Sequence, residues 1–328
     1  MATIHDVARA AGVAPSTVSY VISGKRTVSA ATRRRVQQQI RLLGYRPRAT
    51  EPVVRSDLLA VLAPQRPGID TPTIMRFTAA ATVAARSHGL DLLLLTKDGD
   101  PGELRDAVIG SLADGVIALD VTVADDRVPM LTAVDRPTVL IGVPDHPNAI
   151  TCLDLDFPAA AGLCVDHLAD LGHRRIGLIG PPAIVHARGA SHETRFRQGF
   201  LDSAERRGVR AFVRAYDVST CLNGLVADGV TAVVIQNEAA VTPIMQDLGR
   251  RGLVVPHDMS VIAVGPHGGD PCTLTTVEVP AALLGELAVE MVVDRMQGSA
   301  TPEIRLLPPR LAVRASTSTV DRIIESIE

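Results

Sequence analysis

The sequence has no tryptophan, and its five phenylalanines and three tyrosines make up only 2% of 328 residues. Hydrophobic residues nevertheless account for 46% of the chain. The core therefore has to be built from alanine, valine, leucine and isoleucine. This composition favours an α/β protein over a β-sandwich, and the length is sufficient for two or three domains.

Disulfide and metal frameworks are also missing. The four cysteines lie far apart and form no C-x-x-C pair: Cys152, Cys164, Cys221 and Cys272. We expect free, buried thiols in a reducing compartment, and no metal site.

The sequence shows no secretory signal and no apolar run that approaches the roughly 18 residues of a membrane span. At the N-terminus, Asp6 and Arg9 interrupt the segment MATIHDVARAAG, which lacks the apolar stretch of a signal peptide. We therefore expect a cytoplasmic protein with no membrane partner.

Acidic residues are scarce at the start of the chain. Residues 1–55 contain ten lysines and arginines but only Asp6 and Glu51 as acids, a balance of +8. Because the whole chain carries −3, the remainder carries −11. A basic head on an acidic body is typical of a nucleic-acid-binding domain attached to a regulatory one. A merely solvated basic surface is the alternative.

Three helices are predicted in this head. Thr3 and Asp6 have capping-box spacing, which predicts a helix over Ile4–Ala11. Gly12 can adopt the positive φ needed to leave that helix. Pro15 suits the first turn of a second helix, because its missing N–H would be unpaired there anyway.

The second helix, residues 15–23, has two different faces. Val18, Val21 and Ile22 form an apolar stripe, which leaves small and hydroxylated residues on the outer face. A third helix follows Ser29 and carries Val36, Ile40 and Leu43 on one face. We expect one small core of Ile4, Val7, Val13, Val18, Val21, Val28, Val36 and Ile40. The arrangement is a helix-turn-helix, in which short hydroxylated side chains allow close approach to a major groove.

The head resembles the DNA-binding domain of the lactose-repressor/galactose-repressor family over the segment TIHDVARAAGVAPSTVSYVISGKRTVSAATRRRVQQQIRLLGYRP. The T-I-x-D-V-A run, the A-G-V turn, T-V-S-x-V-I and the closing G-Y-x-P all match. The resemblance implies that the base-reading positions are Pro15, Ser16 and Tyr20. It also implies phosphate contacts from Thr3, Ser19, Ser23 and Lys25.

The head comprises residues 1–48, and a linker of residues 49–57 follows it. In the family this stretch folds on DNA into a hinge helix whose apolar wedge enters the minor groove. Val53 or Val54 could be that wedge here. However, the usual N-A-x-A-R-S-L run is missing and Pro52 interrupts the segment, so a plain flexible linker is the alternative.

From residue 58 onward, apolar strands alternate with helical stretches, which predicts parallel sheets covered on both faces. The strand candidates are 58–64, 91–96, 115–121, 137–143, 175–180, 232–237 and 259–265. The helical candidates include 73–88, 158–171, 194–207 and 239–251. We find no G-x-G-x-x-G, G-x-x-x-x-G-K-[ST], G-x-S-x-G or H-E-x-x-H motif, and we therefore expect neither an enzyme nor a cofactor.

The resemblance extends through the body, in DFPAAAGLCVDHLADLGHRRIGLIG, RFRQGF, VVIQNEAAV and LTTVEVPAALLGELAVEMVVDRM. It implies an effector domain, residues 58–328, that is similar to periplasmic sugar-binding proteins and has two α/β lobes. The first lobe would comprise about 58–155 and 280–311, and the second about 156–279 and 312–328. The chain would cross between them near 154–156, 279–280 and 311–313.

The resemblance also implies which residues contact a small-molecule effector between the lobes. These are Thr71, Pro72, Thr73, Ser191, Arg195, Asn237 and, near the family's usual aspartate, His267. Glu238 would be structural. By this reading the cleft is short of carboxylates and holds His186, Arg188 and His192 near Arg195. This predicts a non-standard effector, for which an anionic molecule is one candidate.

The expected protein is a homodimeric transcriptional regulator, most simply a repressor, that binds a pseudo-palindromic double-stranded DNA operator under the control of that effector. A regulator with a degenerate or effectorless pocket is one alternative. A solute-binding protein or α/β enzyme with an incidental helical head is another.

Overall fold

The computed structural model describes residues 3–23, 28–43, 56–111, 113–134, 136–217, 220–265, 273–298 and 301–320. The chain divides into two compact units, Met1–Ser56 and Asp57–Glu328. We call them the head and the body and describe each by itself. Val53, Val54, Lys25 and His267 lie outside the described residues.

The head contains the three predicted helices: α1 (Ile4–Ala11), α2 (Pro15–Ser23) and α3 (Ala30–Leu43). The capping box at Thr3 and Asp6 is confirmed, and Gly12 ends α1 in the left-handed region with φ 62°. The Ser29 hydroxyl accepts a hydrogen bond from the backbone N–H of Thr32 at the start of α3. The core consists of Val7, Ala8, Ala11, Val18 and Val36, with Ile4, Val13, Val21 and Ile40 packed against it.

The first lobe of the body is built on a parallel sheet with strand order β11-β5-β4-β3-β1-β2. In chain order these strands are β1 (Leu58–Leu62), β2 (Asp91–Leu95), β3 (Gly115–Ala118), β4 (Thr138–Ile141), β5 (Thr151–Leu155) and β11 (Ile304–Leu307). Its helices are α4 (Thr71–Ser87), α5 (Pro101–Gly110), α6 (Arg127–Ala133) and α12 (Ala281–Met296). Separate apolar clusters, one including Phe77 and Val289 and the other Leu104 and Leu131, form its core.

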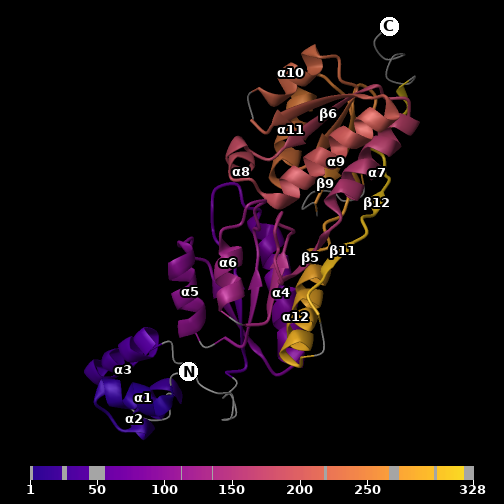
Figure 1. Ribbon diagram of the computed structural model, residues 1–328. Helices are drawn as coiled ribbons and strands as arrows, with labels where there is room; N and C mark the ends of the chain where they lie inside the picture. Colours follow the sequence, from indigo (N-terminus) through magenta and orange to yellow (C-terminus); the bar gives the residue numbers. More distant parts are fainter. Residues whose placement is uncertain are drawn as a thin grey trace. The chain divides into compact units, whose positions relative to one another are not determined.

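The second lobe has strand order β12-β10-β9-β8-β6-β7, parallel except for the pairing of β10 with β12. Its strands are β6 (Arg175–Gly180), β7 (Arg210–Ala215), β8 (Ala232–Ile235), β9 (Ser260–Val264), β10 (Thr275–Val277) and β12 (Leu311–Ala312). Its helices are α7 (Phe157–Asp170), α8 (Ala183–Ala187), α9 (Ser191–Arg207), α10 (Cys221–Ala227) and α11 (Glu238–Arg250). Figure 1 shows α7 and α9 side by side on this lobe, and α4 and α12 side by side on the first.

All seven strand candidates and the four named helices are present, which confirms the α/β architecture with parallel sheets. Five of the described strands had no candidate: β5, β7, β10, β11 and β12. The sequences TCLDL and RAFVRA carry charged residues within the strand, so they lack the continuous apolar pattern that identified the others. The exposed edge strand β11 has a buried side chain only at Leu307.

The chain passes between the lobes three times. The passages lie between β5 and α7, between β10 and α12, and between β11 and β12. The third falls between Leu307 and Leu311, upstream of the predicted 311–313.

Cys152, Cys164 and Cys221 are free and buried, as expected. Within the described ranges, no helix combines the length and apolar composition needed to cross a membrane.

The packing of α7 against α9 gives a first prediction. A Cβ at Gly199 would lie 2.5 Å from the Pro158 Cα and 2.7 Å from its carbonyl oxygen. Gly199→Ala should therefore force the helices apart and lower stability by about 1–3 kcal/mol, the usual range for overpacking. Gly249→Ala is the matched control, because a Cβ there meets nothing within 4 Å.

The control should be neutral or stabilise the body by about 0.5–1 kcal/mol, because alanine is a better helix former than glycine. Chemical denaturation followed by circular dichroism measures both variants. Equal midpoints for the two variants would contradict the close packing of α7 on α9.

Candidate functional site

A cavity of about 210 Å³ lies between the two lobes of the body. Its wall is formed where strands end: Leu119–Val121 follow β3, Gln236–Glu238 follow β8, and Asp154 is near the end of β5. The N-terminal turns of α4 and α7 contribute Thr73 and Phe157. This is the edge of a parallel sheet where ligands bind in open α/β proteins.

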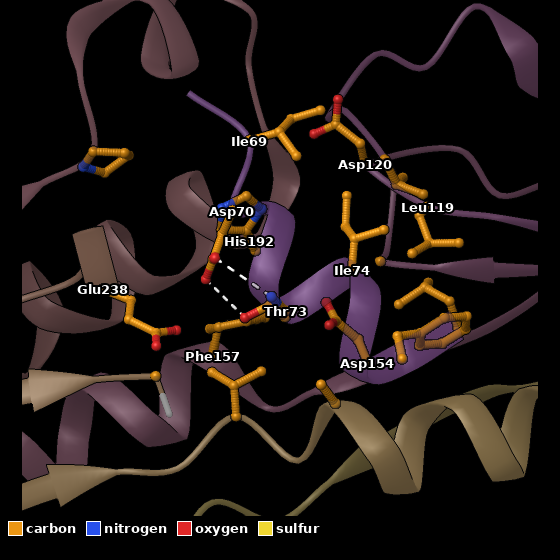
Figure 2. Close-up of a pocket in the computed structure, with 18 of the residues that line it drawn as sticks. Ile69, Asp70, Thr73, Ile74, Leu119, Asp120, Asp154, Phe157, His192 and Glu238 are labelled. Atoms are coloured by element: carbon orange, nitrogen blue, oxygen red, sulfur yellow. Dashed lines mark hydrogen bonds between the residues drawn. The ribbon is translucent and has the colours of Figure 1, made fainter. Parts of the chain in front are cut away.

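Asp70 and Glu238 form an acidic side of the cavity (Figure 2). Asp70 caps α4 by accepting hydrogen bonds from the backbone N–H of Thr73 at 3.4 Å and from its hydroxyl at 2.7 Å. Glu238, the first residue of α11, pairs with Arg76 of α4 at 3.2 Å, so this ion pair joins the lobes. Burial and the neighbouring Asp70 raise the pKa of Glu238 to about 7, against the opposing effect of Arg76.

Asp154 is a second buried acid in the wall, with 4% of its surface exposed. Its Oδ2 atom accepts a hydrogen bond from Arg195 Nη1 of α9 at 2.8 Å, and Oδ1 accepts one from the Leu155 N–H. Burial raises the pKa of Asp154 to about 7, although Arg195 favours the ionised form. Arg195 therefore reaches the cavity through Asp154 and is not itself among the lining residues.

Asp120 lies between two arginines and has a strained backbone. Its φ is 53°, in the left-handed region that non-glycine residues seldom adopt. Arg127, paired with Asp125 at 2.7 Å, donates hydrogen bonds to the carbonyls of Leu119 and Asp120 and holds this turn. The Asp120 carboxylate faces Arg188 at 3.2 Å and Arg66 at 3.6 Å, and Arg188 comes from the second lobe.

Backbone contacts also join the lobes beside the cavity. The N–H of Ser191 donates to the Val121 carbonyl, the N–H of Val123 donates to the Gly189 carbonyl, and Thr122 forms a bridge with Ala190. The side chain of Ser191 donates to the Val143 carbonyl. These bonds hold the second-lobe segment that carries Arg188 and His192 against the first lobe.

The predicted effector residues fall into three groups. Thr73 and Asn237 line the cavity. Thr71 and Pro72 are exposed at the start of α4, while Ser191 is buried in the interlobe contact; none of these three lines the cavity. Arg195 stands behind Asp154. The family motif R-x-x-G-F has its arginine three residues before the glycine. Here the residue three before Gly199 is the fully buried Phe196, so Arg195 lies one residue away from the family's arginine position.

The expectation of a cleft short of carboxylates is wrong. Four acidic residues line it: Asp70, Asp120, Asp154 and Glu238. The family motif identifies only the position after β9, whereas Asp120 and Glu238 follow β3 and β8. Asp120 is the second residue after β3 and Glu238 is the third after β8, so the strand-end rule could have found both. Glu238 is also part of the wall and not only structural.

The sequence places His186, Arg188 and His192 near the predicted cleft. Two of them, Arg188 and His192, line the cavity. Burial lowers the pKa of His192, whose ring lies 5.8 Å from that of Phe157. His186 instead contacts the buried Glu193 at 3.1 Å.

In the head, α2 carries five of the predicted DNA-contacting residues, Pro15, Ser16, Ser19, Tyr20 and Ser23. Ser16 is exposed, whereas Pro15, Ser19 and Tyr20 are half-buried. Thr3 is exposed, but its hydroxyl is 2.7 Å from Asp6 Oδ2 and takes part in the cap of α1. Ser23 is the last residue of α2. No acidic residue occurs in α2, so nothing on this helix repels a phosphate.

Comparison with known proteins gives two family matches. Residues 3–48 match the family described as bacterial regulatory proteins, lacI family. Residues 165–317 match a periplasmic binding protein-like domain.

Curated relatives match over nearly the whole chain. The HTH-type transcriptional regulator CelR of Thermobifida fusca is 30% identical, over 96% of this chain and 98% of the relative. The HTH-type transcriptional repressor PurR of Mannheimia succiniciproducens is 27% identical, over 98% of this chain and all of the relative.

Solved structures agree with the fold. A transcriptional regulator CelR–cellobiose complex superposes with a TM-score of 0.70 at 25% identity, covering 96% of this chain and 100% of that one. A lac repressor dimer bound to operator and the anti-inducer ONPF also gives 0.70, at 24% identity, covering 97% and 99%.

A helix-turn-helix head and a two-lobed body with a cavity between its lobes define the class of ligand-responsive transcriptional regulators. Within that class, the chain belongs to the lacI family of bacterial regulatory proteins. It is a helix-turn-helix transcriptional regulator.

The raised pKa of Asp154 gives a second prediction. The folded protein holds this proton up to about pH 7, whereas an unfolded carboxyl loses it near its ordinary value of 3.8. The folded state thus binds more protons, so the contribution of Asp154 to stability falls as pH rises from 3.8 to about 7. Asp154→Asn should reduce this decline.

Urea midpoints at several pH values across that window test the effect, with Asp100→Asn, a helix cap outside the cavity, as the control. A decline that is as steep in Asp154→Asn as in the parent protein would contradict the assignment to Asp154.

Proposed function

We propose that the protein is a repressor that binds a pseudo-palindromic operator as a homodimer and that a small molecule in the interlobe cavity controls this binding. We assign it no catalytic activity. Because its proposed partner is chromosomal DNA, we place it in the cytoplasm.

The observation that carries the proposal is the occurrence of both parts in one chain: the acid-free helix α2 on a basic head, and a cavity whose wall comes from both lobes. An occupant of that cavity contacts both lobes and so binds some lobe arrangements better than others. The relatives support the two binding steps, since one solved structure holds cellobiose and another holds operator DNA and an anti-inducer.

The residues proposed to read bases are Pro15, Ser16 and Tyr20, and those proposed to approach phosphates are Thr3, Ser19, Ser23 and Lys25. Val53 and Val54 are the proposed minor-groove wedge. For the cavity, we retain Thr73 and Asn237 as effector contacts and add Asp70, Asp120, Asp154, His192 and Glu238 from its wall.

The proposed dimer has a suitable surface on α4. Pro72, Met75, Ala79 and Val83 are exposed at helical spacing on the side away from the cavity-lining Ile74 and Phe77. Met75 is 44% exposed and Val83 is 73% exposed. An exposed apolar stripe on a helix is typical of a protein–protein interface, and the related lac repressor structure is a dimer.

Tyr20→Ala should relax base preference, whereas Lys25→Ala should weaken all DNA binding to a similar degree. Loss of a base contact costs about 1–3 kcal/mol, roughly ten- to hundredfold in affinity, and only on the preferred sequence. Fluorescence anisotropy with a duplex selected from random sequences and with a scrambled duplex measures both effects. Unchanged selectivity in Tyr20→Ala would contradict its role in base reading, and no sequence preference in the parent protein would contradict the proposed function.

The α4 stripe gives a prediction for assembly. The double variant Met75→Asp, Val83→Asp should sediment as a monomer, because dimerisation would bury two carboxylates in an apolar contact. Leu163→Asp is the matched control, since Leu163 is an exposed leucine on α7 of the other lobe. Sedimentation equilibrium measures the oligomeric state, and a double variant that remains dimeric would exclude α4 from the interface.

A further inference from the structure

The polar part of the cavity wall is dominated by hydrogen-bond acceptors. Nine polar side chains line it, and four of them are carboxyls: Asp70, Asp120, Asp154 and Glu238. Among the described residues, Arg188 is the only arginine in the same wall. An anionic ligand would therefore approach several carboxylates and one already paired cation.

The carboxyls differ in how they are neutralised. Arg195 pairs with Asp154, while Arg188 and Arg66 flank Asp120. Asp70 and Glu238 have only Arg76 between them, which pairs with Glu238 and whose side chain is 42% exposed. Among the described residues Asp70 has no ion-pair partner; its hydrogen bonds come from the neutral groups of Thr73 and, when Glu238 is protonated, from that carboxyl.

These two carboxyls face each other from opposite lobes. Asp70 precedes α4 in the first lobe and Glu238 begins α11 in the second, and Figure 2 shows their side chains pointing toward the same space. Asp70 is one of the causes that raise the pKa of Glu238. The space between them therefore carries an excess negative potential when both are ionised.

Arg188 Nε is buried in the wall without an acceptor among the described residues, but the donors of Thr73 and Gln236 are engaged. The Thr73 hydroxyl donates to Asp70, and the Gln236 amide N–H donates to the His192 carbonyl. In contrast, Gln236 Oε1 and Asp120 Oδ2 accept no hydrogen bond from the described residues, although both are buried and the Asp120 side chain is 93% buried. A ligand that brings N–H donors would match this imbalance.

The rest of the wall is apolar. Twelve of its residues are apolar, and they come from both lobes: Ile69, Ile74, Phe77, Leu119, Val121, Ile141, Phe157, Pro181, Val264, Val279, Ala281 and Leu284. A free sugar, with hydroxyls on every side, would leave many of its groups against hydrocarbon. A compact apolar or aromatic body suits these side chains better.

We propose that the effector is an organic cation, a protonated amine on an apolar body, whose ammonium group lies between Asp70 and Glu238. This inference rests on the proposed function, because it names the ligand class of the same cavity. The ammonium group supplies the charge that these two carboxyls lack, and its three N–H donors suit an acceptor-rich wall. The body contacts the apolar residues around Phe77 and Phe157.

Such a ligand would also couple the two lobes. Asp70 and Glu238 repel each other when both are ionised, and a cation between them replaces that repulsion with two attractions. It therefore favours arrangements in which the lobes are close, and this differential binding is what an effector needs to shift a conformational equilibrium.

Three probes that share one aromatic body test the ligand class: 2-phenylethylamine, 2-phenylethanol and 3-phenylpropanoate. Isothermal titration into the full-length protein should show the amine binding at least about tenfold more tightly than either analogue, the usual advantage of a charge-assisted hydrogen bond. Its affinity should rise between pH 6 and pH 8, because Glu238, beside Asp70 and Arg76, loses its proton near pH 7.

Two variants locate the ammonium group. Asp70→Asn and Glu238→Gln should each weaken amine binding about tenfold or more and leave 2-phenylethanol binding unchanged. Asp100→Asn and Glu103→Gln are matched controls, since they are the cap and a first-turn acid of α5, outside the cavity. Circular dichroism shows whether each variant is folded.

The proposal would be overturned if the alcohol or the carboxylate bound as tightly as the amine or more tightly. It would also be overturned if the amine did not bind up to ~10 mM, a concentration well above that of a useful effector. Unchanged amine binding in both cavity variants would overturn it as well. Operator binding by the same preparation without ligand is measured in parallel. A protein that binds operator but not the amine retains the proposed function and loses the cation, whereas one that binds no DNA loses the proposed function whatever the titration shows.

Discussion

Parallel strands end at the same edge of a sheet, and in this protein both sheets present that edge to one cavity. Each chain segment that leaves a strand there must turn toward a helix, and its polar groups lie where the two lobes meet. This is why residues as distant in sequence as Asp70, Asp120, Asp154 and Glu238 share one wall. The three passages of the chain between the sheets keep the two edges opposite each other, so the cavity depends on both lobes.

As a consequence, several carboxyls are buried close together, and nearby positive charges have to offset their negative charge. These charges come from arginines in the wall or behind it: Arg195 for Asp154, Arg66 and the lining Arg188 for Asp120, and Arg76 for Glu238. The arginines do not fully offset the burial of these carboxyls, because burial still raises the pKa of Asp154 and of Glu238 to about 7. Because three of these ion pairs join the lobes, a ligand that changes the charge of the cavity also changes how the lobes hold together.

The head follows a different rule. Its core is small and made almost entirely of valine, alanine and isoleucine, and its helices begin and end at local signals such as the capping box at Thr3 and Asp6 and the positive φ of Gly12. Every one of these signals acts within four residues. The three helices were therefore predictable from the sequence at nearly their observed bounds, including the start of α2 at Pro15 and of α3 after Ser29.

The sequence by itself determined the helix-turn-helix, the alternation of strands and helices and the family, because these depend on short-range signals, hydrophobic periodicity and motif spacing. It did not reveal the strands β5 and β7, whose charged residues hide the apolar pattern. Only the tertiary structure decided the chemistry of the cavity. Arg195 has the residue type of a ligand contact, yet it pairs with the buried Asp154. Asp70, which caps α4, faces Glu238 of the other lobe. The charge that a ligand meets depends on which partners already neutralise each side chain, and those partners lie up to 162 positions away along the chain.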